Sequence, residues 1–321
     1  MYAAEPVRLV FDTDLGNDAD DAMALAVIHA LQTRGECELL AITTTKDNPF
    51  VAPMADLLNT FYGRPEIPIA IVKNGATKED GKYNRQVLEL KDDNGNPRYP
   101  RTLTPESAAN LPDAVPFLRK LLAGQPDGSV VLVQVGFFTN FARLLDTPAD
   151  DISPLTGKEL IAKKVKLLSL MAGTFNEPPG SKEYNVVNDI PSAQKLIAQW
   201  PTEMVFSGFE IGRLVQYPSA SIKEDYGYVK HHPLQDTYRF YHGSLDSSQW
   251  LFDLTSVLYA VRPNRGYFTL SQNGTVTVQD DGQTTFMPDE KGRHRYMIVN
   301  PGQIIMVREA LVQLCSEPPK R

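Results

Sequence analysis

Five carboxylates stand within ten residues near the start of the chain, in the stretch "VRLVFDTDLGNDADDAMALAV": Asp12, Asp14, Asp18, Asp20 and Asp21. No Lys or Arg lies among them. Crowded carboxylates repel one another, and burial without a partner raises the pKa of each. A hard cation relieves that repulsion, and oxygen ligands without His or Cys favour Ca²⁺ or Mg²⁺ over zinc. The stretch therefore predicts a metal site.

A purely structural role accounts for only part of this cluster. Asp20 and Asp21 open a helical pattern, and acids are favourable in the first turn of a helix. The same reason does not apply to Asp12 and Asp14, which follow directly after the apolar run "VRLVF". We therefore interpret the cluster as a site, although Asp18 by itself is adequately explained as a helix-start residue.

The elements around the cluster alternate between short β-branched runs and helical runs with apolar positions at helical spacing. This alternation predicts an α/β fold, a mostly parallel sheet with helices on both faces and a Rossmann-like core, in a single domain over residues 1–321. The expected strands are 7–11, 37–45, 67–72, 129–135, 164–173 and 203–209, and the expected helices are 20–35, 51–63, 114–123, 139–146, 190–200 and 250–263.

Two segments depart from the alternation. Residues 75–109 form a long polar connection, which is typical of a lid or a binding loop. After Pro263 the stretch "TLSQNGTVTVQDDGQTTF" predicts β-hairpins at the C-terminal end. The acids themselves fall at the carboxyl end of the first strand, where open parallel sheets bind their ligands.

Composition excludes several classes of protein. The net charge of -7 disfavours non-specific binding to nucleic acid or to an acidic membrane surface. No apolar run approaches the ~18–20 residues that span a bilayer, and the two cysteines, Cys37 and Cys315, cannot form a disulfide framework. The N-terminus lacks a signal-peptide pattern, which predicts a cytoplasmic protein. The alternative is a periplasmic or secreted protein whose leader has been removed before "AAEP".

Several motifs resemble those of the nucleoside hydrolases, the inosine-uridine preferring family. "DTDLGNDADDAMAL" resembles its N-terminal signature, with two extra residues before the Asp pair. "AITTTKDN", "VQVGFFTN", "LMAGTFN…EYNVVND" and "WLFDLTSVLYAVRP" are similar to its later motifs and follow in the family's order between Val7 and Pro263. The resemblance implies the nucleoside hydrolase fold, a Ca²⁺ cofactor, a ribonucleoside substrate cleaved to ribose and free base, and a dimeric or tetrameric homo-oligomer.

The resemblance also implies roles for individual residues. Ca²⁺ would be held by Asp14, Asp21, Asp253 and the backbone carbonyl of Val135. Asp14 would also take a proton from the attacking water. The ribose hydroxyls would be held by Asp20, Asn48, Asn176, Glu183 and Asn185. Because of the two extra residues, either Asp18 or Asp20 is the acid that contacts the sugar.

These residue types suit the implied reaction on chemical grounds. Cleavage of a glycosidic bond passes through an oxocarbenium-like sugar and needs a water that is activated at neutral pH. A metal lowers the pKa of that water, and a neighbouring carboxylate completes the deprotonation. Asn and Glu supply the donors and acceptors for sugar hydroxyls.

The residue before the late Asp departs from the family's pattern. Family members often carry a His there, and this chain has Phe252. The acid that would protonate the departing base is therefore not identified by position. Candidates lie just upstream, where Tyr241 and His242 can donate a proton and Trp250 can stack on a base. The preferred base is left open.

Two other classes of function fit parts of the pattern. An apolar strand ending in Asp-x-Asp also opens the haloacid-dehalogenase-like Mg²⁺ phosphatases, in which Asp12 would be the nucleophile and Asp14 the general acid. A non-catalytic nucleoside- or sugar-binding protein would need Asn48, Asn185 and Glu183, but would not need a metal. Metal content and a phosphatase assay separate these alternatives.

Overall fold

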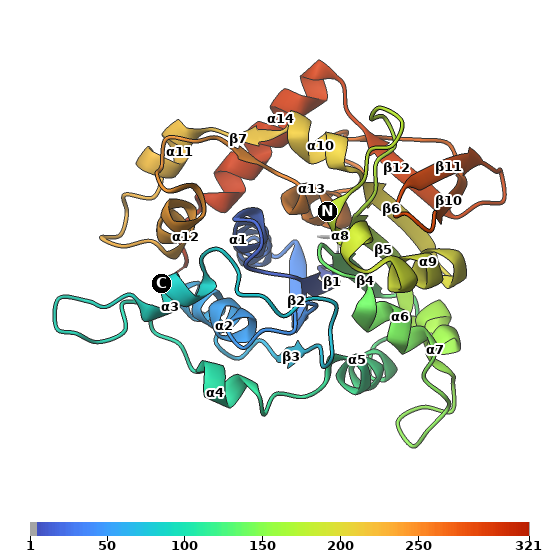
Figure 1. Ribbon diagram of the computed structural model, residues 1–321, viewed down its shortest axis with the longest axis horizontal. Helices are drawn as coiled ribbons and strands as arrows, with labels where there is room; N and C mark the ends of the chain where they lie inside the picture. Colours follow the sequence, from blue (N-terminus) through green and yellow to red (C-terminus); the bar gives the residue numbers. More distant parts are fainter. Residues whose placement is uncertain (1–4, 321) are drawn as a thin grey trace.

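The computed structural model describes residues 5–320, and within them one large sheet forms the centre of the molecule (Figure 1). Its strands run in the order β11-β10-β12-β6-β5-β4-β1-β2-β3, with β9 pairing at β12. The strands are β1 (Val7–Thr13), β2 (Cys37–Thr44), β3 (Ile69–Ile71), β4 (Val130–Gln134), β5 (Val165–Met171), β6 (Glu203–Ser207), β9 (Thr269–Leu270), β10 (Gly274–Val278), β11 (Thr284–Pro288) and β12 (His294–Ile298), and a separate two-stranded sheet joins β7 (Gln216–Tyr217) to β8 (Gln249–Trp250).

Helices connect and cover these strands, so the predicted α/β fold with a mostly parallel sheet is confirmed. The helices are α1 (Asp20–Thr33), α2 (Val51–Phe61), α3 (Asn84–Glu89), α4 (Pro105–Ala108), α5 (Ala114–Ala123), α6 (Thr139–Leu145), α7 (Gly157–Lys164), α8 (Tyr184–Asn188), α9 (Ile190–Gln199), α10 (Phe209–Leu214), α11 (Ser219–Glu224), α12 (Pro233–His242), α13 (Asp253–Val261) and α14 (Pro301–Cys315).

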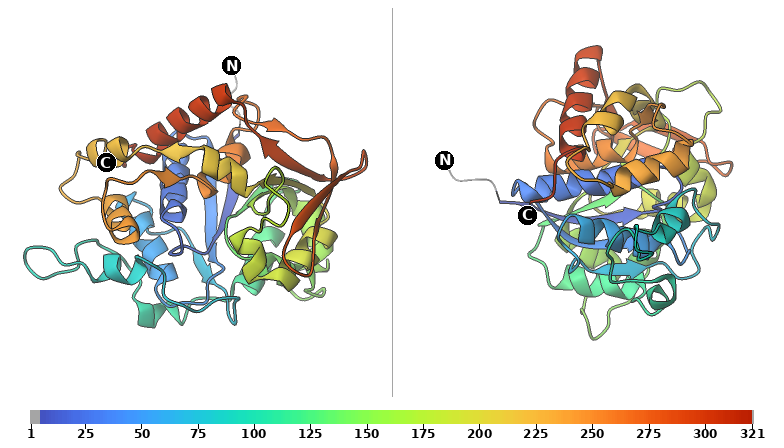
Figure 2. Two further views of the ribbon diagram at one scale, coloured as in Figure 1. Left: turned by 45° about the horizontal axis from the view of Figure 1, so that its top comes forward. Right: turned by 90° about the vertical axis from the view of Figure 1, so that its left-hand side faces the viewer.

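Both faces of the sheet are buried, as the apolar strand sequences require. In β4, Val131 and Val133 belong to one apolar core and Val130 and Leu132 to the other, because successive side chains point to opposite faces. Helices α1, α13 and α14 pack together over one face, and α5, α6, α7 and α9 cover the other (Figures 1 and 2). The sheet is therefore the middle layer of three.

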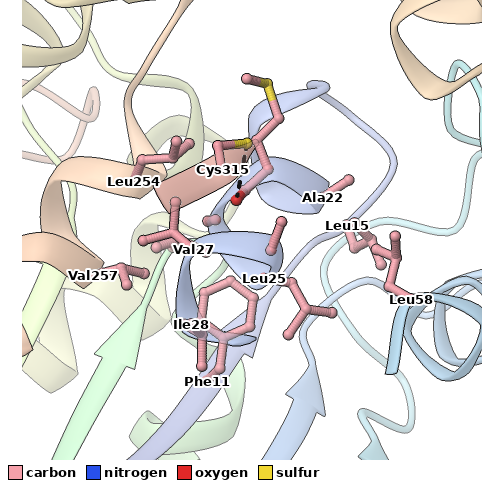
Figure 3. Close-up of a cluster of buried hydrophobic side chains, with 14 of the residues drawn as sticks. Phe11, Leu15, Ala22, Leu25, Val27, Ile28, Leu58, Leu254, Val257 and Cys315 are labelled. Carbon is pink, nitrogen blue, oxygen red and sulfur yellow. Dashed lines mark hydrogen bonds between the residues drawn. The ribbon is translucent and has the colours of Figure 1, made fainter. Parts of the chain in front are cut away.

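Helix α1 lies between the sheet and the outer helices, and this explains why it is apolar on nearly every side. Residues Ala22 to Leu31 are all buried, and they contact β-sheet residues such as Phe11 as well as Leu254 and Val257 of α13 (Figure 3). Full burial holds the first turn of α1, with its acids, in a fixed place above the end of β1.

The C-terminal region shows where the sequence-based prediction was incomplete. The predicted hairpin is present as β10 and β11, which pair antiparallel. Its continuation, β12, pairs parallel with β6, so the tail extends the central sheet and does not form a separate unit. The long polar connection at 75–109 contains the two short helices α3 and α4.

The sequence predicted no membrane-spanning segment and no signal peptide. Within residues 5–320, none of the helices has both the length and the apolar character that crossing a bilayer requires. Residues 1–4, which entered the expectation about the compartment, lie outside the described residues.

Candidate active site

A cavity of about 480 Å³ opens at the carboxyl edge of the central strands. The segments that follow β1, β2, β4, β5 and β6 all reach it, together with the first turns of α1 and α13. Its lining consists of Asp14, Asn17, Asp18, Asp20, Asp21, Lys46, Glu79, Asp80, Gly81, Lys82, Val135, Met171, Glu183, Tyr184, Asn185, Phe209, Tyr241, Trp250, Phe252 and Asp253. Residues from five strand ends thus meet at one place, which is where parallel sheets bind ligands.

Three carboxylates form the tightest acidic group in this cavity. Asp20, Asp21 and Asp253 are all buried, and each offers an oxygen that lies within 4.8 Å of the others. Asp20 and Asp21 come from α1, and Asp253 is the first residue of α13. The fold therefore brings the N-terminal acids and the late Asp together across more than two hundred residues of sequence, which the short motifs alone did not establish.

Burial and mutual repulsion act on this group. Burial raises the pKa of Asp20, Asp21 and Asp253 well above the usual range, and neighbouring carboxylates raise it further. The pKa of Asp14 rises to about 6, mainly because the side chain is buried. Oxygen-only donors that repel one another at this distance are suited to a divalent cation, so the residues present fit the metal that the sequence analysis expected.

Asp14 has a partner that the sequence analysis did not anticipate. Asn17 Nδ2 donates to Asp14 Oδ2 at 2.5 Å, and Lys46 Nζ donates to Asn17 Oδ1 at 2.5 Å. The Lys46 ammonium lowers the pKa of Asp14 against the effect of burial. Along the chain no Lys or Arg stands among the acids, but in space Lys46 lies beside them, because the end of β2 is next to the end of β1.

Asp20 belongs to the acidic group and also binds the N-terminus of helix α13. Its Oδ2 accepts the backbone N–H groups of Phe252 at 2.8 Å and Asp253 at 2.9 Å. These donors belong to the first turn of α13, where N–H groups lack partners inside the helix. Asp20 therefore fixes the start of α13 and with it the position of Asp253. The neighbouring Asp18 accepts Gln249 Nε2 at 2.6 Å.

Glu183, Asn185 and Val135 form a second polar wall. Glu183 Oε1 accepts the N–H of Asn185 at 2.7 Å, and Oε2 accepts those of Val186 at 3.1 Å and Gly173 at 3.3 Å. Burial raises the pKa of Glu183 to about 7. Asn185 Nδ2 donates to the carbonyl of Val135 at 2.9 Å, which orients the amide toward the cavity. These three expected residues are brought together at the ends of β4 and β5.

Two of the expected sugar contacts lie elsewhere. Asn48 is absent from the cavity lining, and its Nδ2 donates to the carbonyls of Lys78 and Glu79 and to Asp80 Oδ1 at 3.0–3.3 Å. Asn176 is exposed outside the lining. The Asn48 Oδ1 accepts the N–H of Phe50 at 3.0 Å. Asn48 therefore holds the loop whose residues 79–82 line the cavity.

Asp12 is set below the cavity and does not line it. The side chain is fully buried, and its Oδ1 accepts Thr43 Oγ1 at 2.5 Å and Asn140 Nδ2 at 2.8 Å. Burial raises the pKa of Asp12 to about 7. An attacking nucleophile must reach its substrate, so this position contradicts the role that the phosphatase alternative requires of Asp12.

Aromatic side chains form the remaining wall. Phe209 and Phe252 stack with ring centroids 5.2 Å apart, and Trp250 meets Phe252 edge to face at 5.9 Å. Trp250 and Tyr184 are 44% and 52% exposed, so their faces are available to a ligand. Of the two expected acids, Tyr241 lines the cavity, whereas His242 does not and pairs with Gln249 at 2.7 Å.

Several lining residues were missed by sequence reasoning. Asn17 lies within "DTDLGNDADDAMAL", Lys46 within "AITTTKDN" and Tyr184 within "EYNVVND", but no role was predicted for any of the three. Residues 79–82 belong to the polar connection that was expected to be a binding loop. Phe209 follows β6 and had no signal apart from its position at a strand end.

The fold and the cavity define a parallel α/β protein with a buried acidic ligand site at the carboxyl edge of its sheet. The chain belongs to the inosine-uridine preferring nucleoside hydrolase family, whose profile matches residues 9–308. Membership makes it an N-glycosyl hydrolase of nucleosides, and the resemblance seen in the sequence is confirmed. The family assignment favours the hydrolase over the phosphatase and the non-catalytic binding protein.

Solved structures share this fold. A plant nucleoside hydrolase, PpNRh1, has a TM-score of 0.72 and 20% identity over 98% of this chain and 100% of its own. A purine-preferring ribonucleoside hydrolase from Gardnerella vaginalis has a TM-score of 0.69 and 16% identity, covering 96% of this chain and 99% of its own. The inosine-uridine preferring nucleoside hydrolase from Bacillus anthracis has a TM-score of 0.66 and 15% identity, covering 96% and 99%. No curated protein matches the chain.

Proposed function

We propose that the protein hydrolyses the N-glycosidic bond of ribonucleosides to ribose and free base with the help of Ca²⁺. The observation that carries this proposal is the buried group of Asp20, Asp21 and Asp253, whose oxygens lie within 4.8 Å in the cavity. Polar groups suited to sugar hydroxyls and aromatic rings suited to a base line the same cavity. Homo-oligomerisation belongs to the same proposal and rests on the resemblance to the family.

The cation would be held by Asp21 and Asp253, with Asp14, the Val135 carbonyl and the free oxygen of Asp20 as further donors. So many protein oxygens suit Ca²⁺, which takes about 6–8 of them in flexible geometry, better than Mg²⁺, which keeps several waters. When bound, the cation would supply Lewis-acid activation of water and chelation of sugar hydroxyls. The sequence analysis expected Asp20 to bind a ribose hydroxyl, and this proposal assigns it to the cation instead.

Asp14 serves as the general base in this proposal. Asn17 Nδ2 donates a hydrogen bond to Asp14 Oδ2, and this bond fixes the orientation of the carboxylate. The other oxygen, Asp14 Oδ1, is then free to accept a proton. Asp14 lines the cavity beside Asp20, Asp21 and Asp253, so its carboxylate lies where a water held by the cation would need a base. Lys46 keeps the carboxylate ionised by its charge and fixes Asn17 by its hydrogen bond.

The sugar would be held by Glu183, Asn185 and Asp18. A carboxylate offers about four acceptor positions, and three backbone N–H groups occupy Glu183, so one position is free for a hydroxyl. Asn185 lines the same cavity, and its Oδ1 accepts no hydrogen bond within residues 5–320. Asp18 replaces Asp20 as the acid on the opposite side, because Asp20 is engaged by α13.

Removal of the metal is the first test. Chelation is expected to abolish activity and to lower the melting temperature, because a ligand that binds only the folded state stabilises it and because the freed carboxylates repel one another. Elemental analysis of the purified protein should find one Ca²⁺ per chain. A protein with no divalent ion and with unchanged melting after chelation would contradict the metal assignment.

The leaving group provides a second test. In this proposal Trp250 and Phe252 contact the base, and no imidazole of residues 5–320 lines the cavity with them. The rate should therefore climb steeply as the leaving group improves, and an activated aryl riboside should be cleaved much faster than inosine. Tyr241→Phe serves as the control for an unrecognised acid. Selective loss of inosine cleavage in that variant would identify Tyr241 as the acid, and a flat dependence on leaving group would contradict the expectation.

A further inference from the structure

The charges around the cavity are strongly one-sided. Eight carboxylates line it, and the only ammonium groups among the lining residues of the described chain are those of Lys46 and Lys82. One of the eight, Asp80, is paired with Arg85 at 2.6 Å. A divalent cation, both lysines and Arg85 together offset at most five of the eight negative charges. The acidic residues are Asp14, Asp18, Asp20, Asp21, Glu79, Asp80, Glu183 and Asp253.

Few side chains in the cavity could protonate a departing base. None of the five histidines lines the cavity, and the structure describes all of them: His29, His231, His232, His242 and His294. Tyr241 does line it, but burial and the neighbouring Asp18 charge raise the pKa of Tyr241 well above its usual range. A neutral base leaves most easily after protonation, and neither a histidine nor Tyr241 is suited to donate that proton in this cavity.

The aromatic wall adds a feature that attracts positive charge. Phe209, Trp250, Phe252, Tyr184 and Tyr241 all line the cavity. The face of an aromatic ring attracts cations, and the attraction is largest for Trp. One of these rings already carries a cation in the structure, because Lys82 Nζ lies 4.5 Å from the centroid of the Tyr241 ring.

We propose that the preferred substrates of this site are ribosides whose base carries a fixed positive charge, such as N-ribosylpyridinium compounds or N7-alkylated purine ribosides. The inference rests on the proposed hydrolase function and specifies its substrate class. The observations that carry it are the excess of carboxylates in the cavity, the exposed Trp250 and Tyr184 faces and the absence of a lining imidazole.

The chemistry of the bond agrees with this charge. In a cationic riboside the C1′–N bond breaks, its electron pair moves to the base nitrogen, and the base departs as a neutral molecule without receiving a proton. Water forms the new C1′–O bond and gives its proton to Asp14. The products are ribose, neutral base and one proton, so no external acid is consumed. A neutral nucleoside under the same conditions must leave with a negative charge among carboxylates or find a proton donor.

Lys82 is the competing explanation, because an ammonium group beside Tyr241 could itself protonate a neutral base. Its backbone is fixed by the hydrogen bond from Lys82 N to the Gly16 carbonyl at 2.8 Å. If Lys82 serves this purpose, neutral nucleosides gain an acid and cationic ones meet repulsion. The two roles predict opposite effects of the Lys82→Met change, which keeps a similar length and removes the charge.

The principal experiment compares inosine with 7-methylinosine below neutral pH, where the methylated base keeps its positive charge, using the Ca²⁺-loaded protein. We expect kcat/KM to be at least about 10²-fold higher for 7-methylinosine, since a general acid contributes about 10²–10⁴-fold and only the neutral substrate needs one. An activated but neutral aryl riboside controls for intrinsic bond lability. KM for the cation should rise with salt, whereas KM for the aryl riboside should not.

Two variants complete the test. Glu79→Gln removes one exposed lining charge and should raise KM for 7-methylinosine more than for the neutral aryl riboside. Lys82→Met should leave inosine cleavage measurable and should improve the use of 7-methylinosine. Loss of inosine cleavage in Lys82→Met with 7-methylinosine spared would make Lys82 the acid and would overturn the inference.

The outcomes separate the two proposals. Cleavage of inosine at a kcat/KM equal to or above that of 7-methylinosine overturns the substrate class and leaves the hydrolase proposal standing. Cleavage of neither compound by the Ca²⁺-loaded protein overturns both. A preference for the cation that is independent of salt and of Glu79 would show only greater bond lability, and it would also overturn the charge-based inference.

Discussion

The Asp14→Asn variant is expected to lose about 10²–10⁴-fold in kcat, the range by which general-base removal slows an enzyme. The amide cannot accept the proton that Asp14 takes from water. Folding should persist, because the change removes a buried charge that repels Asp21 and Asp253. Steady-state kinetics and thermal melting of the same preparations measure both consequences.

Asp12→Asn is the matched control for this prediction. Asp12 stands two residues earlier on the same strand but lies outside the cavity, with Thr43 and Asn140 as partners. The Asn side chain keeps an Oδ1 that can accept from both partners, but its new Nδ2 takes the place of a buried Oδ2 without a hydrogen-bond partner among the described residues. The control should therefore lose some stability and should retain much of the turnover per folded molecule. Near-normal activity of Asp14→Asn with an inactive, folded Asp12→Asn would contradict the assignment of the base and support phosphatase-like chemistry.

Ribonucleosides should be preferred over 2′-deoxyribonucleosides by a factor on the order of 10⁴ in kcat/KM. A site built to pair hydroxyls rejects an analogue that lacks one, because its own buried polar groups then lose their partners. Asp18, Glu183 and Asn185 are the groups at stake here, and Glu183 and Asn185 are buried. Parallel kinetics on inosine and 2′-deoxyinosine give the ratio directly.

Asn185→Asp tests which groups produce this discrimination. The change keeps the size of the side chain and removes the Nδ2 donor that binds the Val135 carbonyl at 2.9 Å. We expect the ratio between the two series to fall sharply in this variant. Asn48→Asp is the comparison, because Asn48 binds the loop at Lys78 to Asp80 and does not line the cavity. Equal rates on both series in the wild type would refute the sugar assignment.

Local patterns in the sequence determined the order of the elements and the kind of site. Apolar β-branched runs and helical spacing depend on near neighbours, so β1 to β6 and the longer helices α1, α2, α5, α6 and α9 could be predicted. The short helices α3, α4, α7 and α8 were not predicted. Asp14 and Asp21 could be placed at a ligand-binding edge, because the carboxyl ends of parallel strands meet there. The tail was harder to predict, because the parallel pairing of β12 with β6 depends on a contact about ninety residues away.

The tertiary structure alone decided which side chains face one another. Asp20 binds the N–H of Phe252, which is 232 residues away, and Lys46 reaches Asn17 from the next strand. Asn48 follows the predicted strand as expected, yet its amide is taken up by the loop at Lys78. Hydrogen-bond partners depend on which segments pack together, and a motif cannot specify that. The sequence therefore determined where the acids gather, and packing decided which of them contact the cavity and which hold the fold.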